Sequence, residues 1–113
     1  MSKRTPILLL EDILESSQRI IEYTTGLTYE EFSLDNKTID AVIRNFEIIG
    51  EASNILPEEL KERYSNIDWY RIRGFRNRIV HDYFGVDIEI VWKISCEQIP
   101  TLISDISNII RSL

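Results

Sequence analysis

Apolar residues recur at spacings of three and four along most of the chain, and this helical period limits the fold more than any other feature. The first segment shows it in Ile7, Leu10 and Ile13, which are separated by acidic and polar residues. The same period returns in residues 39–53 and, over a longer stretch, in residues 88–110. No segment alternates every second residue, as a half-buried strand would. The sequence therefore predicts an all-α protein, a small up-and-down bundle of about four to five helices.

Residues that cap or stop helices divide this pattern into segments. Gly26 is expected to end the first helix, Pro57 to stop the second, and Gly85 to close the fourth. The candidate N-caps of the later helices are Ser33 or Asp35, Asp68, and Asp87. The expected helices cover residues 7–24, 35–56, 57–64, 69–83 and 88–110, with a brief helical link at 28–32 and an interruption at Pro100.

The apolar stripes in residues 39–53 and 88–110 are long for one small core. They form either the core of a monomer or a face that joins two copies of the chain. A chain of 113 residues, 43% of them hydrophobic, suits one globular domain, which we expect to span residues 1–113.

The N-terminus and the cysteine content favour a cytoplasmic protein with no membrane partner. The apolar run of residues 7–10 ends at Glu11, which is too early for a signal peptide or a membrane span. Cys96 is the single cysteine, so no intramolecular disulfide can form. The single histidine, His81, and Cys96 together cannot supply the usual ligands of zinc. The four glycines form neither of the common phosphate-binding patterns. We expect no metal and no cofactor.

Charge is distributed unevenly along the chain. The 13 basic and 19 acidic residues give a net charge of −6, which disfavours a protein that coats nucleic acid non-specifically. Residues 69–81 nevertheless contain four arginines, no lysine and no acid. Arg71, Arg73 and Arg78 are candidates for binding phosphate, because guanidinium groups bind phosphate bidentately and stack on bases. The alternative is a solvated surface, on which Arg78 pairs with Asp82 four residues later.

The remaining arginine of this segment, Arg76, falls inside the apolar arc of a helix drawn over residues 69–83. An arginine directed at a core needs a carboxylate or backbone partner, or a place at a seam between subunits. Glu47 and Glu51, four residues apart on the second expected helix, are candidate partners. Their alternative is an ordinary exposed pair.

Asn77 and His81 lie four residues apart and share another face of that helix, together with Tyr70 and Gly74. A lone histidine is more often structural than catalytic, but the neighbouring arginines and Asn77 make a catalytic role credible. Histidine titrates closest to neutral pH and can transfer protons, whereas arginine can stabilise a developing negative charge.

The segment Arg76-Asn77-Arg78-Ile79-Val80-His81-Asp82-Tyr83 fits the pattern R-x4-H-x-Y. With the run Phe46-Glu47-Ile48-Ile49-Gly50-Glu51-Ala52 and the long final helix, it resembles the HepT-like toxins of the HEPN superfamily of small helical ribonucleases. The resemblance covers nearly the whole chain.

This resemblance implies a homodimer that cleaves RNA without a metal, as the toxin of a type VII-like toxin–antitoxin system. Arg76 and His81 would be catalytic and Asn77 would support them, with Arg71, Arg73 and Arg78 as further RNA contacts. The antitoxin would be a nucleotidyltransferase of the MntA type, which silences the toxin by transferring AMP to Tyr83. Without the resemblance, Tyr83 reads as a structural residue that helps to cover the core.

Two other functions remain open at this stage. A non-catalytic HEPN module could bind substrate for a nucleotidyltransferase partner. A plain helical scaffold for dimerisation is the second, but it leaves the arginine segment unexplained.

Overall fold

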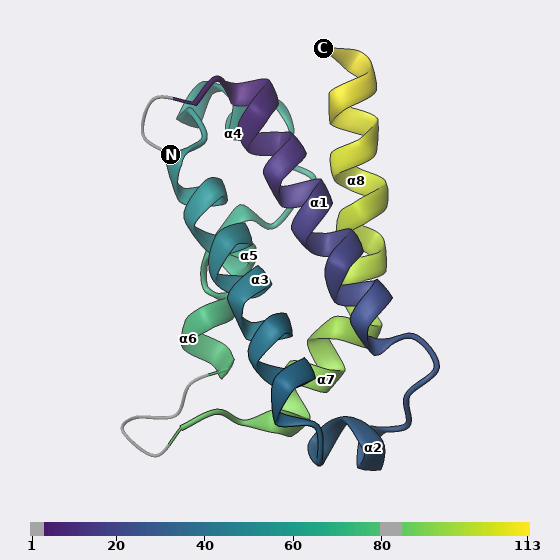
Figure 1. The fold of residues 1–113 in the computed structure, drawn as a ribbon. Helices are drawn as coiled ribbons and strands as arrows, with labels where there is room; N and C mark the ends of the chain where they lie inside the picture. The colour runs from purple at the N-terminus through teal and green to yellow at the C-terminus, as the bar shows by residue number, and fades with distance from the viewer. Residues whose placement is uncertain (1–3, 80–84) are drawn as a thin grey trace.

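In the computed structural model, every regular element of the described residues is a helix. Successive long segments run in opposite directions along the bundle (Figure 1). The structure describes residues 4–79 and 85–113, apart from the side chain of Arg76. The predicted all-α class is confirmed. The helices are α1 (Pro6–Thr24), α2 (Tyr29–Ser33), α3 (Asn36–Ile55), α4 (Glu58–Arg63), α5 (Trp69–Arg73), α6 (Phe75–Ile79), α7 (Ile88–Glu97) and α8 (Ile99–Ser112).

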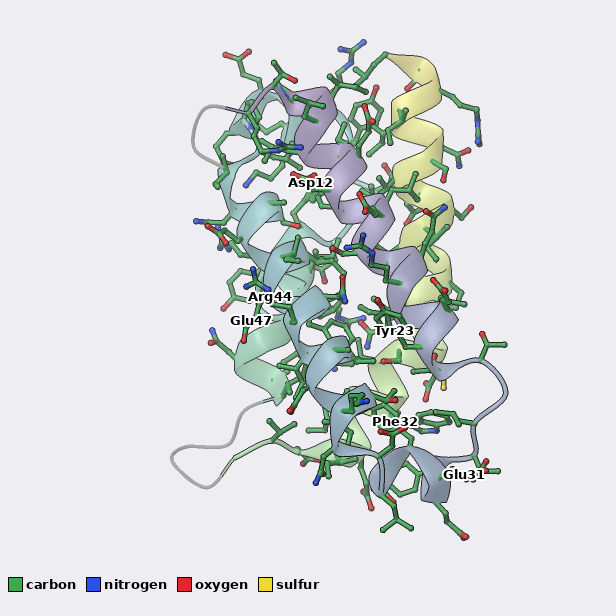
Figure 2. All side chains as sticks on the ribbon, viewed as in Figure 1. Asp12, Tyr23, Glu31, Phe32, Arg44 and Glu47 are labelled. Carbon is green, nitrogen blue, oxygen red and sulfur yellow. The ribbon has the colours of Figure 1, made fainter. Side chains whose placement is uncertain are left out.

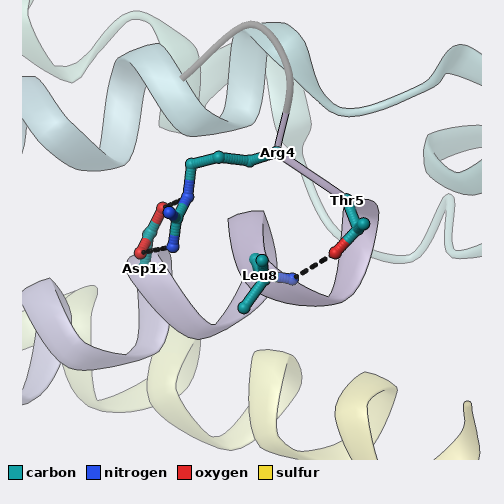
Figure 3. Close-up of polar contacts among 4 residues, drawn as sticks. All are labelled: Arg4, Thr5, Leu8 and Asp12. Atoms are coloured by element: carbon teal, nitrogen blue, oxygen red, sulfur yellow. Dashed lines mark hydrogen bonds and ion pairs between the residues drawn. The ribbon is translucent and has the colours of Figure 1, made fainter.

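Side chains at the helix ends explain where the elements begin. Thr5 caps α1 and accepts a hydrogen bond from the Leu8 amide at 3.4 Å, while the Arg4 guanidinium binds both carboxylate oxygens of Asp12 at 2.7 and 2.9 Å (Figure 3). Thr28 and Glu31 form a reciprocal capping box on α2. The predicted N-caps are confirmed at three positions: Asp35, Asp68 and Asp87.

Two predicted breakers, Gly26 and Pro57, lie at helix ends. Gly26 takes a left-handed φ of 85° just after α1. Gly85 takes a φ of 103°, but the residues directly before it lie outside the described ones, so its role in closing a helix stays a prediction. Pro57 follows the end of α3 and caps α4. The expected final helix is interrupted at Gln98, which ends α7 and begins α8, and Pro100 occupies the first turn of α8, where its missing N–H costs least.

The core lies where α1 packs against α3 on one side and α8 on the other (Figure 1). The apolar stripe of α3 is buried there through Ile39, Val42, Phe46 and Ile49. The stripe of the last two helices is buried in the same cluster through Ile94, Ile99, Leu102 and Ile106. The centres of both long stripes are therefore buried in the chain's own core. Ile43, Trp92 and Ile103 of these stripes are only partly buried, so a face that joins two copies of the chain stays a prediction.

At the lower end of the bundle, an aromatic cluster joins α2 to α7. The Trp92 ring lies 5.0 Å from the Phe32 ring and 6.2 Å from the Tyr29 ring between centroids. Burial first, and then the carboxylates of Glu89 and Asp87, raise the pKa of Tyr29. Figure 2 shows Phe32 at this end of the molecule, close to the turn that leads into α3.

Candidate nucleic-acid interface

The arginine segment folds as two short helices, and the prediction of a single helix over residues 69–83 is wrong. Asp68 begins α5 by accepting a hydrogen bond from the Arg71 amide at 3.0 Å. Gly74 then ends it, at φ −89° and ψ 3°, with its amide donating to the carbonyls of Tyr70 and Arg71 at 3.0 and 3.2 Å. The helical path resumes at Phe75, because the Arg78 amide donates to the Gly74 carbonyl at 3.1 Å. The residue with the lowest helix propensity apart from proline marks the break.

Three buried apolar side chains hold the segment on the bundle: Ile72, Phe75 and Ile79. The Phe75 ring meets the Phe46 ring of α3 edge to face, with centroids 5.5 Å apart and an interplanar angle of 86°. These residues belong to the apolar arc predicted from the sequence. Because that arc faces the core, the side chains of Arg71, Arg73 and Arg78 are exposed.

Gly50 lets α5 approach α3 closely. A Cβ added to Gly50 would lie 3.3 Å from the Arg73 carbonyl oxygen, which is tighter than nine in ten such contacts. The glycine of the Glu-x-x-Gly-Glu-Ala run therefore lies directly beneath the end of α5. This contact sets how deeply the arginine segment sits on the bundle.

The exposed arginines meet around one recess of about 320 Å³. Among the described residues, its lining is made by Tyr70, Arg71, Arg73, Gly74, Asn77 and Arg78, none of which is acidic. The structure thus brings together all three arginines predicted to bind phosphate, and places Asn77 with them. Tyr70, Gly74 and Asn77, which were expected to share a face with His81, all line this recess, whereas His81 lies outside the described residues.

The polar contacts of these arginines within the described residues are weak. Arg71 Nε lies 3.9 Å from Asp68 Oδ2, and Arg78 Nη1 donates to Gln98 Oε1 at 3.5 Å. The Arg73 guanidinium lies 5.6 Å from the centre of the Tyr70 ring. Exposed ion pairs at such distances contribute little stability, so exchanging them for phosphate costs little. The predicted pair of Arg78 with Asp82 lies outside the described residues.

A second recess, of about 480 Å³, adjoins the first and shares Arg73 and Asn77 with it. Glu47 and Glu51 line it from α3. Figure 2 shows Arg44 and Glu47 next to each other on α3, and their closest charged atoms are 3.8 Å apart. Glu51 is exposed. Whether either acid pairs with Arg76 stays a prediction, because the Arg76 side chain lies outside the described residues.

Comparison with known proteins gives the family. The model of the HepT-like family, described as "Ribonuclease HepT-like", matches residues 13–109. The chain belongs to this family. It is 43% identical over 100 residues to the "probable ribonuclease HepT" of Thermococcus cleftensis, covering 88% of this chain and 91% of that one.

Two further relatives are each named "putative RNase". One, from Methanocaldococcus jannaschii, is 39% identical over 113 residues, covering 100% of this chain and 93% of its own. The other, from Caldanaerobacter subterraneus subsp. tengcongensis, is 37% identical over 108 residues, covering 96% of each chain. No solved structure matches the chain significantly.

In this HepT-like chain the R-x4-H-x-Y motif begins in α6 and continues beyond it. The backbone of Arg76 follows the buried Phe75, within one helical turn of Ile79. His81 and Tyr83 lie outside the described residues, so their predicted roles stay predictions. The Ile79 carbonyl accepts a hydrogen bond from the Asp87 amide at 2.7 Å, which fixes the end of α6 to the residue that caps α7.

The described residues of this HepT-like chain were compared with what a metal site and a membrane-spanning helix require. Within residues 4–79 and 85–113, no group of three or more His, Cys, Asp or Glu side chains is arranged to hold a metal ion. None of the helices in those ranges has the length and hydropathy needed to cross a membrane.

Sequence reasoning missed one residue of this HepT-like surface. Tyr70 was assigned only to a helix face, but its ring is 79% exposed and lies beside Arg73. The signal that could have found it is the spacing of an aromatic residue three positions before an arginine in a segment without acids.

Proposed function

We propose that this chain is an endoribonuclease that cleaves RNA without a metal, and that it acts as the toxin of a type VII-like toxin–antitoxin system. Its membership of the HepT-like ribonuclease family supports the reaction. The observation that carries the proposal is the recess formed by the three exposed arginines, Arg71, Arg73 and Arg78, next to Arg76 in sequence and with no acid among its described lining residues. In a chain with a net charge of −6, this is a local site for a phosphate chain.

The reaction proposed for this site uses the substrate's own nucleophile. The 2′-hydroxyl of one ribose attacks the adjacent phosphorus, and the bond to the 5′-oxygen of the next nucleotide breaks. The products end in a 2′,3′-cyclic phosphate and a 5′-hydroxyl. His81 accepts the proton of the 2′-hydroxyl or donates one to the leaving oxygen, and Arg76 stabilises the charge on the phosphorane.

A homodimer is part of the proposal. The cleavage needs a base and an acid, and each chain contains one histidine. Two chains with facing motifs supply both groups, and they bring two basic recesses to one RNA. Light scattering on the purified protein tests this point, and a monomer at the concentration at which the protein is active would contradict it.

The proposed regulator is a nucleotidyltransferase antitoxin of the MntA type. The Tyr83 hydroxyl would attack the α-phosphorus of ATP, form a phosphodiester to AMP and release pyrophosphate. The added phosphate would lie next to the arginine segment and compete with RNA. Mass spectrometry after co-expression with such an enzyme tests this step, and a Tyr83 peptide that stays unmodified would contradict it.

Cleavage of a labelled RNA in excess EDTA tests the proposed activity. The wild-type protein should cleave equally well with and without the chelator, whereas Arg76→Ala and His81→Ala should each lose most of the activity. Arg19→Ala is the matched control, because Arg19 is an exposed arginine of α1 that pairs with Glu15 at 2.6 Å. A folded wild-type protein that cleaves no RNA and is not toxic to cells would contradict the proposal.

A further inference from the structure

Tyr70 is conspicuous because its ring is left in solvent. Tyr70 is 79% exposed, whereas five other aromatic side chains each pack against another ring: Tyr29, Phe32, Phe46, Phe75 and Trp92. An exposed tyrosine with an arginine beside it is a surface able to bind a flat ligand, since both groups offer a planar face.

The position of Tyr70 on its helix directs its side chain away from the core. Asp68 caps α5, and the buried Ile72 fixes the face that α5 turns to the core. Tyr70 therefore projects into solvent, with the Arg73 guanidinium 5.6 Å from its ring centre. A platform carried by a helix that is already formed needs less backbone ordering on binding than one carried by a flexible loop.

The surroundings of Tyr70 differ in charge on its two sides. Toward α6 it borders the recess that Arg71, Arg73 and Arg78 line, with no acid among the described lining residues. Toward α4 it borders another recess of about 320 Å³, where Glu58 and Glu62 are balanced by Lys61 and Arg73. A phosphate chain that passes Tyr70 is therefore drawn toward α6.

We infer that Tyr70 and Arg73 form a stacking platform for one unpaired base of the RNA substrate, with Arg71 and Arg78 binding the adjoining phosphates. This inference rests on the proposed ribonuclease function and adds a substrate requirement to it. A recess of about 320 Å³ is at the lower end of the range for small-ligand pockets, which suits a single nucleotide. Bases inside a duplex are stacked on both faces, so only a single-stranded segment can use the platform.

The position of the platform relative to the motif gives a further property. Tyr70 lines the same recess as Asn77, the motif residue proposed to support Arg76 and His81. The stacked base therefore belongs to a nucleotide that flanks the cleaved bond. Cleavage should prefer single-stranded RNA and should show a base preference beside the cut, set by how strongly each base stacks.

A binding experiment tests the platform separately from cleavage. The probe is a series of 2′-O-methyl oligonucleotides, which lack the proposed nucleophile, each with 2-aminopurine at one position. The full-length protein should quench the fluorescence strongly at one register. Tyr70→Ala should abolish that quenching and weaken binding about tenfold, whereas Tyr70→Trp should keep both. Tyr23→Ala is the control, because Tyr23 is a 37% exposed tyrosine of α1 (Figure 2).

Each outcome decides one point. Equal binding and equal quenching by wild type and Tyr70→Ala would overturn the platform, as would a wild type that binds none of the oligonucleotides. A change in association state of Tyr70→Ala, with oligonucleotide binding unchanged, would assign Tyr70 to a protein interface instead. Cleavage of unmodified RNA by the wild type is measured in parallel: if it is present and Tyr70→Ala retains the rate and pattern, the platform fails while the proposed function stands.

Discussion

The edge-to-face pair of Phe46 and Phe75 should couple the arginine segment energetically to the bundle. Phe46 belongs to α3 and Phe75 begins α6, directly before Arg76. Both side chains are fully buried, and their centroids are 5.5 Å apart. We therefore expect that the losses in the free energy of unfolding caused by Phe46→Leu and Phe75→Leu do not add when the two changes are combined.

The magnitude follows from the geometry. An edge-to-face pair contributes about 0.5–1.5 kcal/mol beyond the burial of the two rings. Each single change to leucine should also lose ring contacts and burial, for a cost of about 1–2 kcal/mol. A domain of 113 residues has a free energy of unfolding of roughly 6–17 kcal/mol, so all variants should still fold. The double variant should cost less than the sum of the singles by about 1 kcal/mol.

Urea unfolding followed by circular dichroism measures this coupling. With a dependence on urea of about 2 kcal/mol per molar, each single variant should unfold at a midpoint lower by about 0.5–1 M. The control combines Phe75→Leu with Phe32→Leu, since the Phe32 ring packs on Trp92 in the cluster that joins α2 to α7. That pair should be additive within about 0.5 kcal/mol. A coupling of zero between Phe46 and Phe75, or an equal one in the control, would refute the reasoning.

Two further predictions concern stability. Lys61 is buried, and its ammonium donates to the Ser53 carbonyl at 2.9 Å at the end of α3. Lys61→Met leaves that carbonyl without its donor, so it should lower the free energy of unfolding by about 1–3 kcal/mol in urea titrations, while the exposed Lys93→Met changes it by less than about 0.5 kcal/mol. The hydrogen bonds from the hydroxyl and the amide of Thr38 lower the pKa of Asp35, so its contribution to stability is present at neutral pH and is lost as the pH falls below the ordinary value of 3.8. Thermal unfolding should show a lower melting temperature for Asp35→Ala at pH 7 and no difference from wild type at strongly acidic pH; a difference that persists in acid would contradict this cause.

Most helix boundaries could be predicted from the sequence because they depend on local chemistry. An Asp side chain caps a helix by bonding an amide three residues later, and this needs no distant partner, which is why Asp35, Asp68 and Asp87 were found. The left-handed turn at Gly26 is equally local. The resemblance carried by the R-x4-H-x-Y motif was confirmed by the match to the HepT-like family.

Features that depend on contacts between distant segments could not be predicted. The end of α5 at Gly74 is a different case: the apolar period runs through residues 69–83 without a gap, and the low helix propensity of the glycine is the local signal of the break. The burial of Lys61, in a short and highly charged helix, follows from the nearby end of α3. The site was predicted in part: the sequence placed the arginines on one segment, but only the fold shows that they line one recess together with Tyr70.

The most direct test of the central claim is the chemistry at the cut bond. The cleavage position is first mapped in an unmodified RNA, and the same RNA is then made with one 2′-deoxy nucleotide immediately before that bond. The account predicts products ending in a 2′,3′-cyclic phosphate and a 5′-hydroxyl, in the presence of EDTA, and no cleavage at the 2′-deoxy position. Cleavage of the 2′-deoxy bond, or products carrying a 5′-phosphate and a 3′-hydroxyl, would contradict it.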